Sequence, residues 1–348
     1  MKFALLFGGA SYEHEISIVS AIALKKVLPI EIFLFLDAEG AFWEIPAEKM
    51  RSDHFSSGGY RKDTPLTLTR GGWLRRGLLK SKPLEGFDTV INLVHGAQGE
   101  DGTIAALLDF YEIAYIGPRL EASVVSFNKR LSKLYAEGAG VGTVPWQTLH
   151  IDGDRRVDFD MPLIVKPLRL GSSIGVSVVR EPERFDYALD VAFEFDDEVL
   201  VEPFLEGVRE YNVAGCRIGD EWVIGRIEAP RKGEYLDFEQ KYLDFGRTDE
   251  VSEADIDETL RDKLIESFKK IYADTFEGAL IRCDFFVHDD AVLLNEINPI
   301  PGSLANYLFD DFAGMMTQLG GALPKRRKIV PDYAYIDKVA RAKGPKAR

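Results

Sequence analysis

The sequence contains almost no cysteine: Cys216 and Cys283 are the only two among 348 residues. Two thiols cannot form a disulfide framework or a metal–thiolate cluster, so a reducing compartment such as the cytoplasm is expected. No apolar run reaches the ~18 residues that a membrane span needs, and the N-terminus lacks the cleavage pattern of a signal peptide. These absences predict a globular protein that works without a membrane.

Positive charge is also scarce, since 43 Lys and Arg stand against 57 Asp and Glu, a net charge of −14. This balance argues against non-specific binding to nucleic acid or anionic membranes, which needs a basic face. The basic end of the chain, from Lys325, has no aromatic or motif context and is predicted to be a solvated helix and tail. An acidic protein that handles phosphate must gather a few cations locally, which makes well-placed lysines informative.

Apolar segments alternate with helical patterns through the first part of the chain. The expected buried strands are residues 3–7, 31–36, 87–96 and 113–117. Helices are expected from Glu13 and from about Thr103. This alternation predicts a parallel sheet with ligand-facing residues where its strands end, and His95, Glu100 and Asp101 lie at such an end. Residues 38–82 show only short pieces broken by glycine pairs and are predicted to be irregular.

Residues Arg282 to Ser303 alternate polar and apolar side chains in two predicted strands joined by an acidic turn. Asp284 in the first strand, and Glu296 and Asn298 in the second, supply the oxygen ligands that Mg²⁺ prefers. The three side chains share one face of the hairpin only if Asp284 lies opposite Glu296 and Arg282 opposite Asn298. This register requires a loop with an odd number of residues or a bulge, so we predict such a loop or a bulge. The same alternation also fits a half-buried hairpin with a solvated polar face.

Three loops are possible ligand contacts, each with a plainer alternative. The segment LRLGSSIGVSVV follows a strand that ends at Lys166, and its amides are suited to covering phosphates. It lacks the G-K-[ST] of a Walker loop and also fits a simple hairpin turn. The Gly8-Gly9 turn between a strand and a helix attracts anions but lacks dinucleotide-binding spacing. Residues 231–248 fit a lid or a surface excursion.

In order and approximate spacing, eight segments resemble the D-alanine–D-alanine ligases of the ATP-grasp superfamily, over about residues 1–310. They are FGGASYEHEIS, NLVHGAQGEDG, SFNKRLSK, LIVKPLRLGSSIGVS, VLVEPFLEG, EQKYLD, RCDFF and NEINPIPG. The resemblance implies an α/β protein of three-domain ATP-grasp architecture. Residues 1–119 would form an N-terminal parallel-sheet substrate domain, 120–202 a central domain and 203–348 a C-terminal domain with a lid at 231–248. ATP would lie between the central and C-terminal domains.

The resemblance also implies a set of nucleotide and metal contacts. The implied ATP-binding residues are Lys129, Lys166, Ser172, Ser173, Glu202, Phe204, Leu205, Glu210 and Lys241. The lysines would neutralise the phosphates, as phosphoryl transfer requires. Glu202 would hold the adenine amino group, backbone groups of Phe204 and Leu205 would read the ring edge, and Glu210 would contact the ribose. Two Mg²⁺ or Mn²⁺ ions would bind Asp284, Glu296 and Asn298.

For the reaction itself, the resemblance implies that Glu13 holds the ammonium of the first D-alanine, with His95 nearby. Glu13, Ser172 and Tyr242 resemble the family's hydrogen-bonded set. Arg282 and the amide of Gly302 would form the oxyanion hole. The first D-alanine would be converted to an acyl phosphate, which the amine of the second then attacks. The sequence does not identify the base that deprotonates this amine.

One position departs from the family. Tyr307 and Leu308 stand where the family usually has Ser followed by Leu or Met, at the second substrate's carboxylate. Selectivity for the second substrate therefore stays open, although Tyr242 beside Lys241 matches the dipeptide-forming members. The resemblance implies a cytoplasmic homodimer that makes D-alanyl-D-alanine for peptidoglycan. The alternatives are a related ligase that uses D-lactate or D-serine and an inactive nucleotide-binding regulator.

Overall fold

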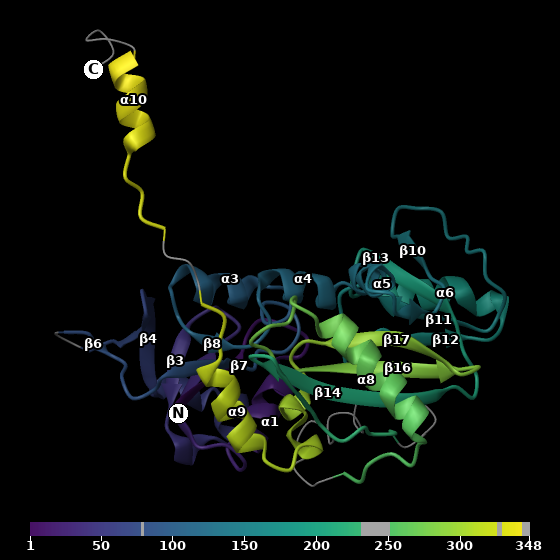
Figure 1. Ribbon diagram of the computed structural model, residues 1–348, viewed down its shortest axis with the longest axis horizontal. Helices are drawn as coiled ribbons and strands as arrows, with labels where there is room; N and C mark the ends of the chain where they lie inside the picture. Colours follow the sequence, from purple (N-terminus) through teal and green to yellow (C-terminus); the bar gives the residue numbers. More distant parts are fainter. Residues whose placement is uncertain (78–79, 231–250, 326–328, 343–348) are drawn as a thin grey trace.

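The computed structural model describes residues 1–77, 80–230, 251–325 and 329–342. Three sheets of eight, four and five strands, each with helices packed nearby, make up the α/β architecture (Figure 1). Among the described residues, no helix has both the length and the apolar character to cross a membrane.

The first sheet has the strand order β6-β5-β4-β3-β2-β1-β7-β8. Its strands are β1 (Phe3–Gly8), β2 (Ile30–Leu36), β3 (Phe42–Ile45), β4 (Thr64–Thr69), β5 (Gly72–Arg75), β6 (Lys82–Pro83), β7 (Thr89–Asn92) and β8 (Tyr115–Ile116). Strands β2, β1, β7 and β8 pair in parallel, which confirms that part of the prediction. Helices α1 (His14–Leu24) and α3 (Thr103–Phe110) follow β1 and β7. The segments that carry Glu13 and His95 therefore leave the same edge of the sheet.

The prediction that residues 38–82 are irregular was wrong. Strands β3 to β6 pair antiparallel and extend the sheet, which is therefore mixed. The short helix α2 (Ser52–Ser56) and the 3₁₀ turns η1 (Ala47–Lys49) and η2 (Gly59–Lys62) lie between them. These strands are too short to show a clear period, and large buried side chains such as Trp73 secure them instead.

The second sheet is antiparallel, in the order β10-β13-β11-β12. Its strands are β10 (Gln147–His150), β11 (Leu163–Pro167), β12 (Ser177–Val179) and β13 (Glu198–Pro203). Helix α6 (Phe185–Phe193), preceded by η3 (Pro182–Arg184), buries Leu189 against Val165 and Val201. In β11, burial alternates, so Lys166 points away from the face that Val165 buries.

The third sheet has the order β15-β14-β16-β17-β9. Its strands are β9 (Gly142–Thr143), β14 (Arg209–Ile218), β15 (Glu221–Ile224), β16 (Ile281–His288) and β17 (Ala291–Asn298). Helix α8 (Glu258–Tyr272) is capped by Asp257, whose side chain accepts a hydrogen bond from the amide of Leu260 at 2.9 Å. Its residues Leu264 and Phe268 are buried, as their spacing predicts. Helices α4 (Leu120–Phe127), α5 (Lys129–Gly138) and α9 (Phe312–Gly321) and the turn η4 (Gly302–Leu308) complete this part.

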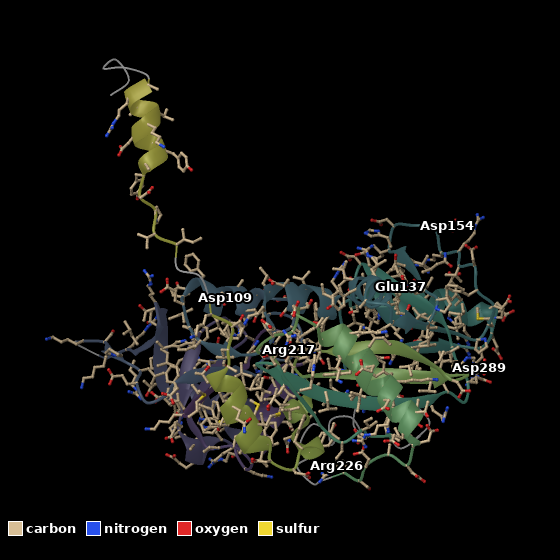
Figure 2. All side chains as sticks on the ribbon, viewed as in Figure 1. Asp109, Glu137, Asp154, Arg217, Arg226 and Asp289 are labelled. Atoms are coloured by element: carbon tan, nitrogen blue, oxygen red, sulfur yellow. The ribbon has the colours of Figure 1, made fainter. Side chains whose placement is uncertain are left out.

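The β16–β17 hairpin has the predicted register, because it contains a bulge. Asp289 and Asp290 form a two-residue turn with φ of 48° and 62°, as a type I′ turn requires. The pairing then shifts between Asp284 and Phe285, which leaves Asn295 of β17 without an opposite residue. Asp284 consequently pairs with Glu296 and Arg282 with Asn298. Asp289 marks the tip of the hairpin in Figure 2.

Helix α10 (Ala334–Ala342) stands apart from the three sheets (Figure 1). None of its residues is buried, and Tyr335 and Ile336 are exposed. The predicted solvated helix near the basic end of the chain is therefore confirmed.

Candidate active site

A cavity of about 180 Å³ lies among the edge of the first sheet, the loop after β11 and the β16–β17 hairpin. The predicted site residues that line it are Glu13, His95, Lys129, Ser172, Glu210, Arg282, Asp284, Glu296, Asn298, Gly302 and Tyr307. The structure thus brings together the residues predicted to bind the first substrate, the metal ions and the oxyanion.

The other predicted residues divide into two groups. Lys166, Ser173, Glu202, Phe204, Leu205 and Leu308 do not line this cavity. Lys241 and Tyr242 lie outside the described residues. The amide of Phe204 donates to the carbonyl of Pro162 at 2.8 Å, so this N–H is already used within the protein.

Glu13 lies at the start of α1 with its carboxylate between two glycines. A Cβ on Gly96 would lie 2.8 Å from Glu13 Oε2, and a Cβ on Gly171 would lie 3.0 Å from Oε1, so this approach requires glycine. The hydroxyl of Ser172 donates to Oε1. Oε2 is buried and has no hydrogen bond to any described residue. An ammonium ligand would satisfy such an oxygen.

The ionisable groups around Glu13 are strongly shifted. Burial raises the pKa of Glu13 to about 7, and the nearby charge of Glu100 acts in the same direction. Burial also raises the pKa of Glu100 to about 8 and lowers that of His95 to about 4. Glu100 lines the cavity and lies in the same polar turn after β7 as His95, where ligand-facing residues are predicted. The sequence assigned it no specific role.

A cluster of cations surrounds Glu202. Lys166 Nζ donates to Glu202 Oε2 at 2.7 Å, and Lys133 pairs with Oε1. Ile164 of β11 lies opposite Glu202 of β13. Lys166, two residues after Ile164, is therefore a diagonal neighbour of Glu202 on the same face of the sheet. Burial raises the pKa of Glu202, but the two lysines outweigh this and hold it below its usual value. Contact of Glu202 with adenine stays a prediction.

The bulge in β17 connects this cluster to the third sheet. The unpaired residue Asn295 accepts a hydrogen bond from Lys166 Nζ at 3.3 Å. One irregularity thus sets the register of the metal-site candidates and directs an amide oxygen at a predicted phosphate ligand. Sequence spacing predicted the first effect and gave no sign of the second.

Lys129 is the first residue of α5, and Asn128 caps that helix by accepting the amide of Leu131 at 3.1 Å. Lys129 Nζ donates to the carbonyl of Leu170. Burial lowers the pKa of Lys129, whereas the negative charge of Glu296 raises it. A helix N-terminus and an adjacent ammonium both favour an anion, so this end of the cavity suits phosphate.

The hairpin residues form a polar wall in the cavity. Arg282 donates to both oxygens of Asp284 at 2.7 and 2.8 Å, and Asn298 Nδ2 donates to the same carboxylate at 3.0 Å. Burial opposes the charge on Arg282, but Asp284 outweighs it and the pKa stays well above its usual value. The side chain of Glu296 makes no hydrogen bond or ion pair with any described residue. The set fits Mg²⁺, because its oxygen donors face one space.

The turn after Gly302 has an unusual backbone. Ser303, Leu304 and Ala305 have φ of 47°, 51° and 47°, which L-residues rarely adopt. Such conformations persist only where surrounding contacts hold them, and they concentrate at functional sites. Asn306 Nδ2 donates to the carbonyl of Ser303 at 3.0 Å and is one of these contacts.

Tyr307 is buried at the cavity wall beside Arg282. Burial raises its pKa to about 12, although a hydrogen bond with Arg282 opposes the shift, so the phenol stays protonated. Asn212 and Glu228 also line the cavity, and Asn212 Nδ2 donates to Glu228 Oε2 at 3.2 Å. Sequence reasoning missed this pair, because polar residues in and beside strands are common and no motif marks these two.

Two family models match the chain: D-ala D-ala ligase N-terminus over residues 2–118 and D-ala D-ala ligase C-terminus over residues 136–319. The chain belongs to the D-alanine–D-alanine ligase family. The D-alanine–D-alanine ligase of Wolinella succinogenes is 55% identical over 345 residues, which cover 99% of this chain and 100% of that protein.

Solved structures agree with this assignment. The crystal structure of the D-alanine–D-alanine ligase from Helicobacter pylori has a TM-score of 0.83 at 49% identity and covers 94% of this chain and 100% of that one. VanG D-Ala:D-Ser ligase from Enterococcus faecalis has a TM-score of 0.73 at 24% identity, over 92% and 98% of the two chains, and shows the shared fold alone. The three-domain ATP-grasp architecture is thereby confirmed.

Proposed function

We propose that this chain joins two D-alanine molecules into D-alanyl-D-alanine, with conversion of ATP to ADP and phosphate, for peptidoglycan precursor synthesis. One observation carries the proposal beyond family membership. In a single cavity, the buried Glu13 Oε2 without a partner faces the same space as Lys129 and Arg282. A ligand with an ammonium at one end and developing negative charge at the other fits that arrangement.

The residues of the cavity support a two-step reaction. Glu13 holds the ammonium of the first D-alanine, so that the carboxylate of this D-alanine is oriented toward the γ-phosphate. Phosphoryl transfer gives an acyl phosphate and ADP, with Lys129 and Lys166 neutralising the phosphates and Lys241 assigned to the γ-phosphate. Phosphorylation is needed because a free carboxylate is a poor electrophile.

In the second step, the amine of the second D-alanine attacks the acyl carbon, and phosphate leaves from the tetrahedral intermediate. The guanidinium of Arg282 and the amide of Gly302 stabilise the negative charge on its oxygen. Tyr307 lies beside Arg282, where it limits the space for the second substrate. Asp284, Glu296 and Asn298 would hold two Mg²⁺ or Mn²⁺ ions, whose charge would stabilise the phosphates.

The domain limits at residues 119 and 202, a homodimer and a cytoplasmic location are part of the same proposal. The separate sheets support the division, since the first ends at β8 and the second at β13. Strand β9 is an exception, because it lies within residues 120–202 but pairs with β17 of the third sheet. Two buried free thiols agree with a reducing compartment.

Phosphate release tests the proposal directly. ATP and Mg²⁺ with D-alanine should give one phosphate for each dipeptide, whereas L-alanine in place of D-alanine should give background release. D-Lactate or D-serine, added with D-alanine, tests the alternative acceptors by mass analysis of the product. Absence of phosphate release with every D-amino acid would contradict the proposal.

A further inference from the structure

Ser20 connects three segments that meet behind the cavity. It lies on α1 and is fully buried. Its Oγ lies 3.1 Å from His95 Nε2 and accepts the amide of Ser303 at 3.2 Å. His95 follows β7 and Ser303 follows Gly302 in η4, whereas Ser20 itself does not line the cavity. Any effect of this hydroxyl on the reaction must therefore pass through its two partners.

The direction of one of these hydrogen bonds follows from the number of protons. The Ser303 N–H can only donate, so Ser20 Oγ accepts there. The single hydroxyl proton is then available to His95 Nε2, because Ser20 has no other hydrogen-bond partner among the described residues. His95 is neutral near pH 7, since burial lowers its pKa to about 4. The neutral ring also donates to the backbone carbonyl of Ile300, and its Nδ1 lies 3.5 Å from Glu100 Oε1, so Ser20 is one of three partners that act on the ring proton.

The second partner is the first residue of the strained turn. Ser303, Leu304 and Ala305 are three consecutive L-residues with positive φ. Ser20 holds the N–H of Ser303 from one side, and Asn306 holds its carbonyl from the other. Because the amide of Gly302 directly precedes this residue, a shift of Ser303 would redirect the proposed oxyanion donor.

We propose that Ser20 is a positioning residue for ligation: it orients the ring of His95, biases its tautomer and holds the Gly302 turn against the substrate end of the first sheet. This inference rests on the proposed function, because its kinetic consequence presupposes turnover with D-alanine. Its structural consequence, the position of the ring proton, does not require turnover.

The kinetic test compares two serines of the same helix. Ser20→Ala should lower kcat about 10- to 100-fold and leave KM for ATP within about twofold, because Ser20 makes no contact with the lysines. Ser17 is the matched control: it is equally buried, donates to the Leu93 carbonyl at 2.6 Å and accepts the Gly8 amide at 2.9 Å. Ser17→Ala should lower the midpoint of thermal unfolding comparably but keep kcat within about twofold.

Ser20→Cys keeps the shape and a weak donor, so it should restore part of the lost kcat. It also serves as the second variant if Ser20→Ala does not fold. An unchanged kcat in both Ser20 variants would overturn the proposal. Equal kcat losses in Ser17→Ala and Ser20→Ala would do so too, because they would show a general loosening of α1.

The structural test is nitrogen-15 NMR of the histidine rings in the full chain, with the His95 signals assigned by their loss in His95→Gln. Ser20→Ala should change the distribution of the ring proton between Nδ1 and Nε2, whereas Ser17→Ala should leave it as in the unaltered chain. An unchanged distribution in Ser20→Ala would overturn the inference. If the unaltered chain releases no phosphate with D-alanine, the proposed function fails, and the ring-proton measurement still decides the role of Ser20.

Discussion

Two buried carboxylates of the site, Glu202 and Glu13, differ in their ionisation although only 2% and 6% of their surfaces are exposed. Burial acts on both in the same direction. Lys166 and Lys133 outweigh it at Glu202, whose pKa falls below its usual value, whereas nothing comparable offsets it at Glu13, whose pKa rises to about 7. Burial thus sets the cost of a charge, and the neighbouring residues decide whether the charge remains.

The difference matches the ligands proposed for the two ends of the site. Around Glu202, the counter-ion keeps two lysines in place near where phosphates would bind. Around Glu13, Glu100 and Glu296 are further acids that raise its pKa, so this end of the site favours an ammonium and metal ions. A chain with net charge −14 therefore concentrates cations at one end of its site and leaves the acids to dominate the other.

Removal of a lysine from the cation cluster should have the largest effect on this comparison. Lys166→Met should reduce turnover about 10³-fold, because phosphate charge loses a partner. It should also lower the free energy of unfolding by about 1–3 kcal/mol, since Glu202 loses one of its two cations and keeps Lys133. Phosphate release and thermal unfolding measure the two effects. The double variant Lys166→Met/Lys133→Met leaves Glu202 without a cation and should lose a further ~3–5 kcal/mol, and a double variant as stable as the single one would disprove the pairing.

Neutralising Glu13, the other carboxylate of this comparison, should have a smaller effect on turnover, and this effect should depend on pH. Glu13 must be ionised to hold an ammonium and its pKa is about 7, so kcat/KM for D-alanine should fall as pH drops through 7. Glu13→Gln should remove this acidic limb and lower kcat/KM about 100-fold at pH 8.

Ser172→Ala provides the matched control, because the Ser172 hydrogen bond lowers the pKa of Glu13. Its acidic limb should therefore move to higher pH without disappearing. An acidic limb that persists in Glu13→Gln would assign the titration to another group.

The sequence predicted those parts of the molecule in which local pattern and tertiary contact agree. Alternation in residues 282–298 implied facing carboxylates only with a bulge, and the bulge is present. The spacing of Leu260, Leu264 and Phe268 predicted the buried face of α8. The resemblance supplied Glu13 and Arg282, which share the cavity although more than 260 positions separate them in the sequence.

What the sequence did not reveal depends on contacts between distant segments. Ser20 is an ordinary serine of a largely buried helix until η4 packs against it. Asn295 has a role only because the bulge turns it toward Lys166. The lysine partners of Glu202 come from different elements, β11 and α5, so no local spacing could indicate them. Strands β3 to β6 were missed because neighbouring strands secure their short segments.

The smallest expected effect concerns stability at the acidic end of the site. Burial raises the pKa of Glu100 from 4.5 to about 8, so the folded chain keeps a proton that the unfolded chain releases between those values. Stability should therefore fall as pH rises through this window. Glu100→Gln should remove that loss and raise the midpoint of thermal unfolding by a few degrees at pH 9, with little change at pH 5. The exposed Glu121→Gln should show no such difference, and equal shifts of the midpoint at both pH values for Glu100→Gln would show that packing, not charge, is responsible.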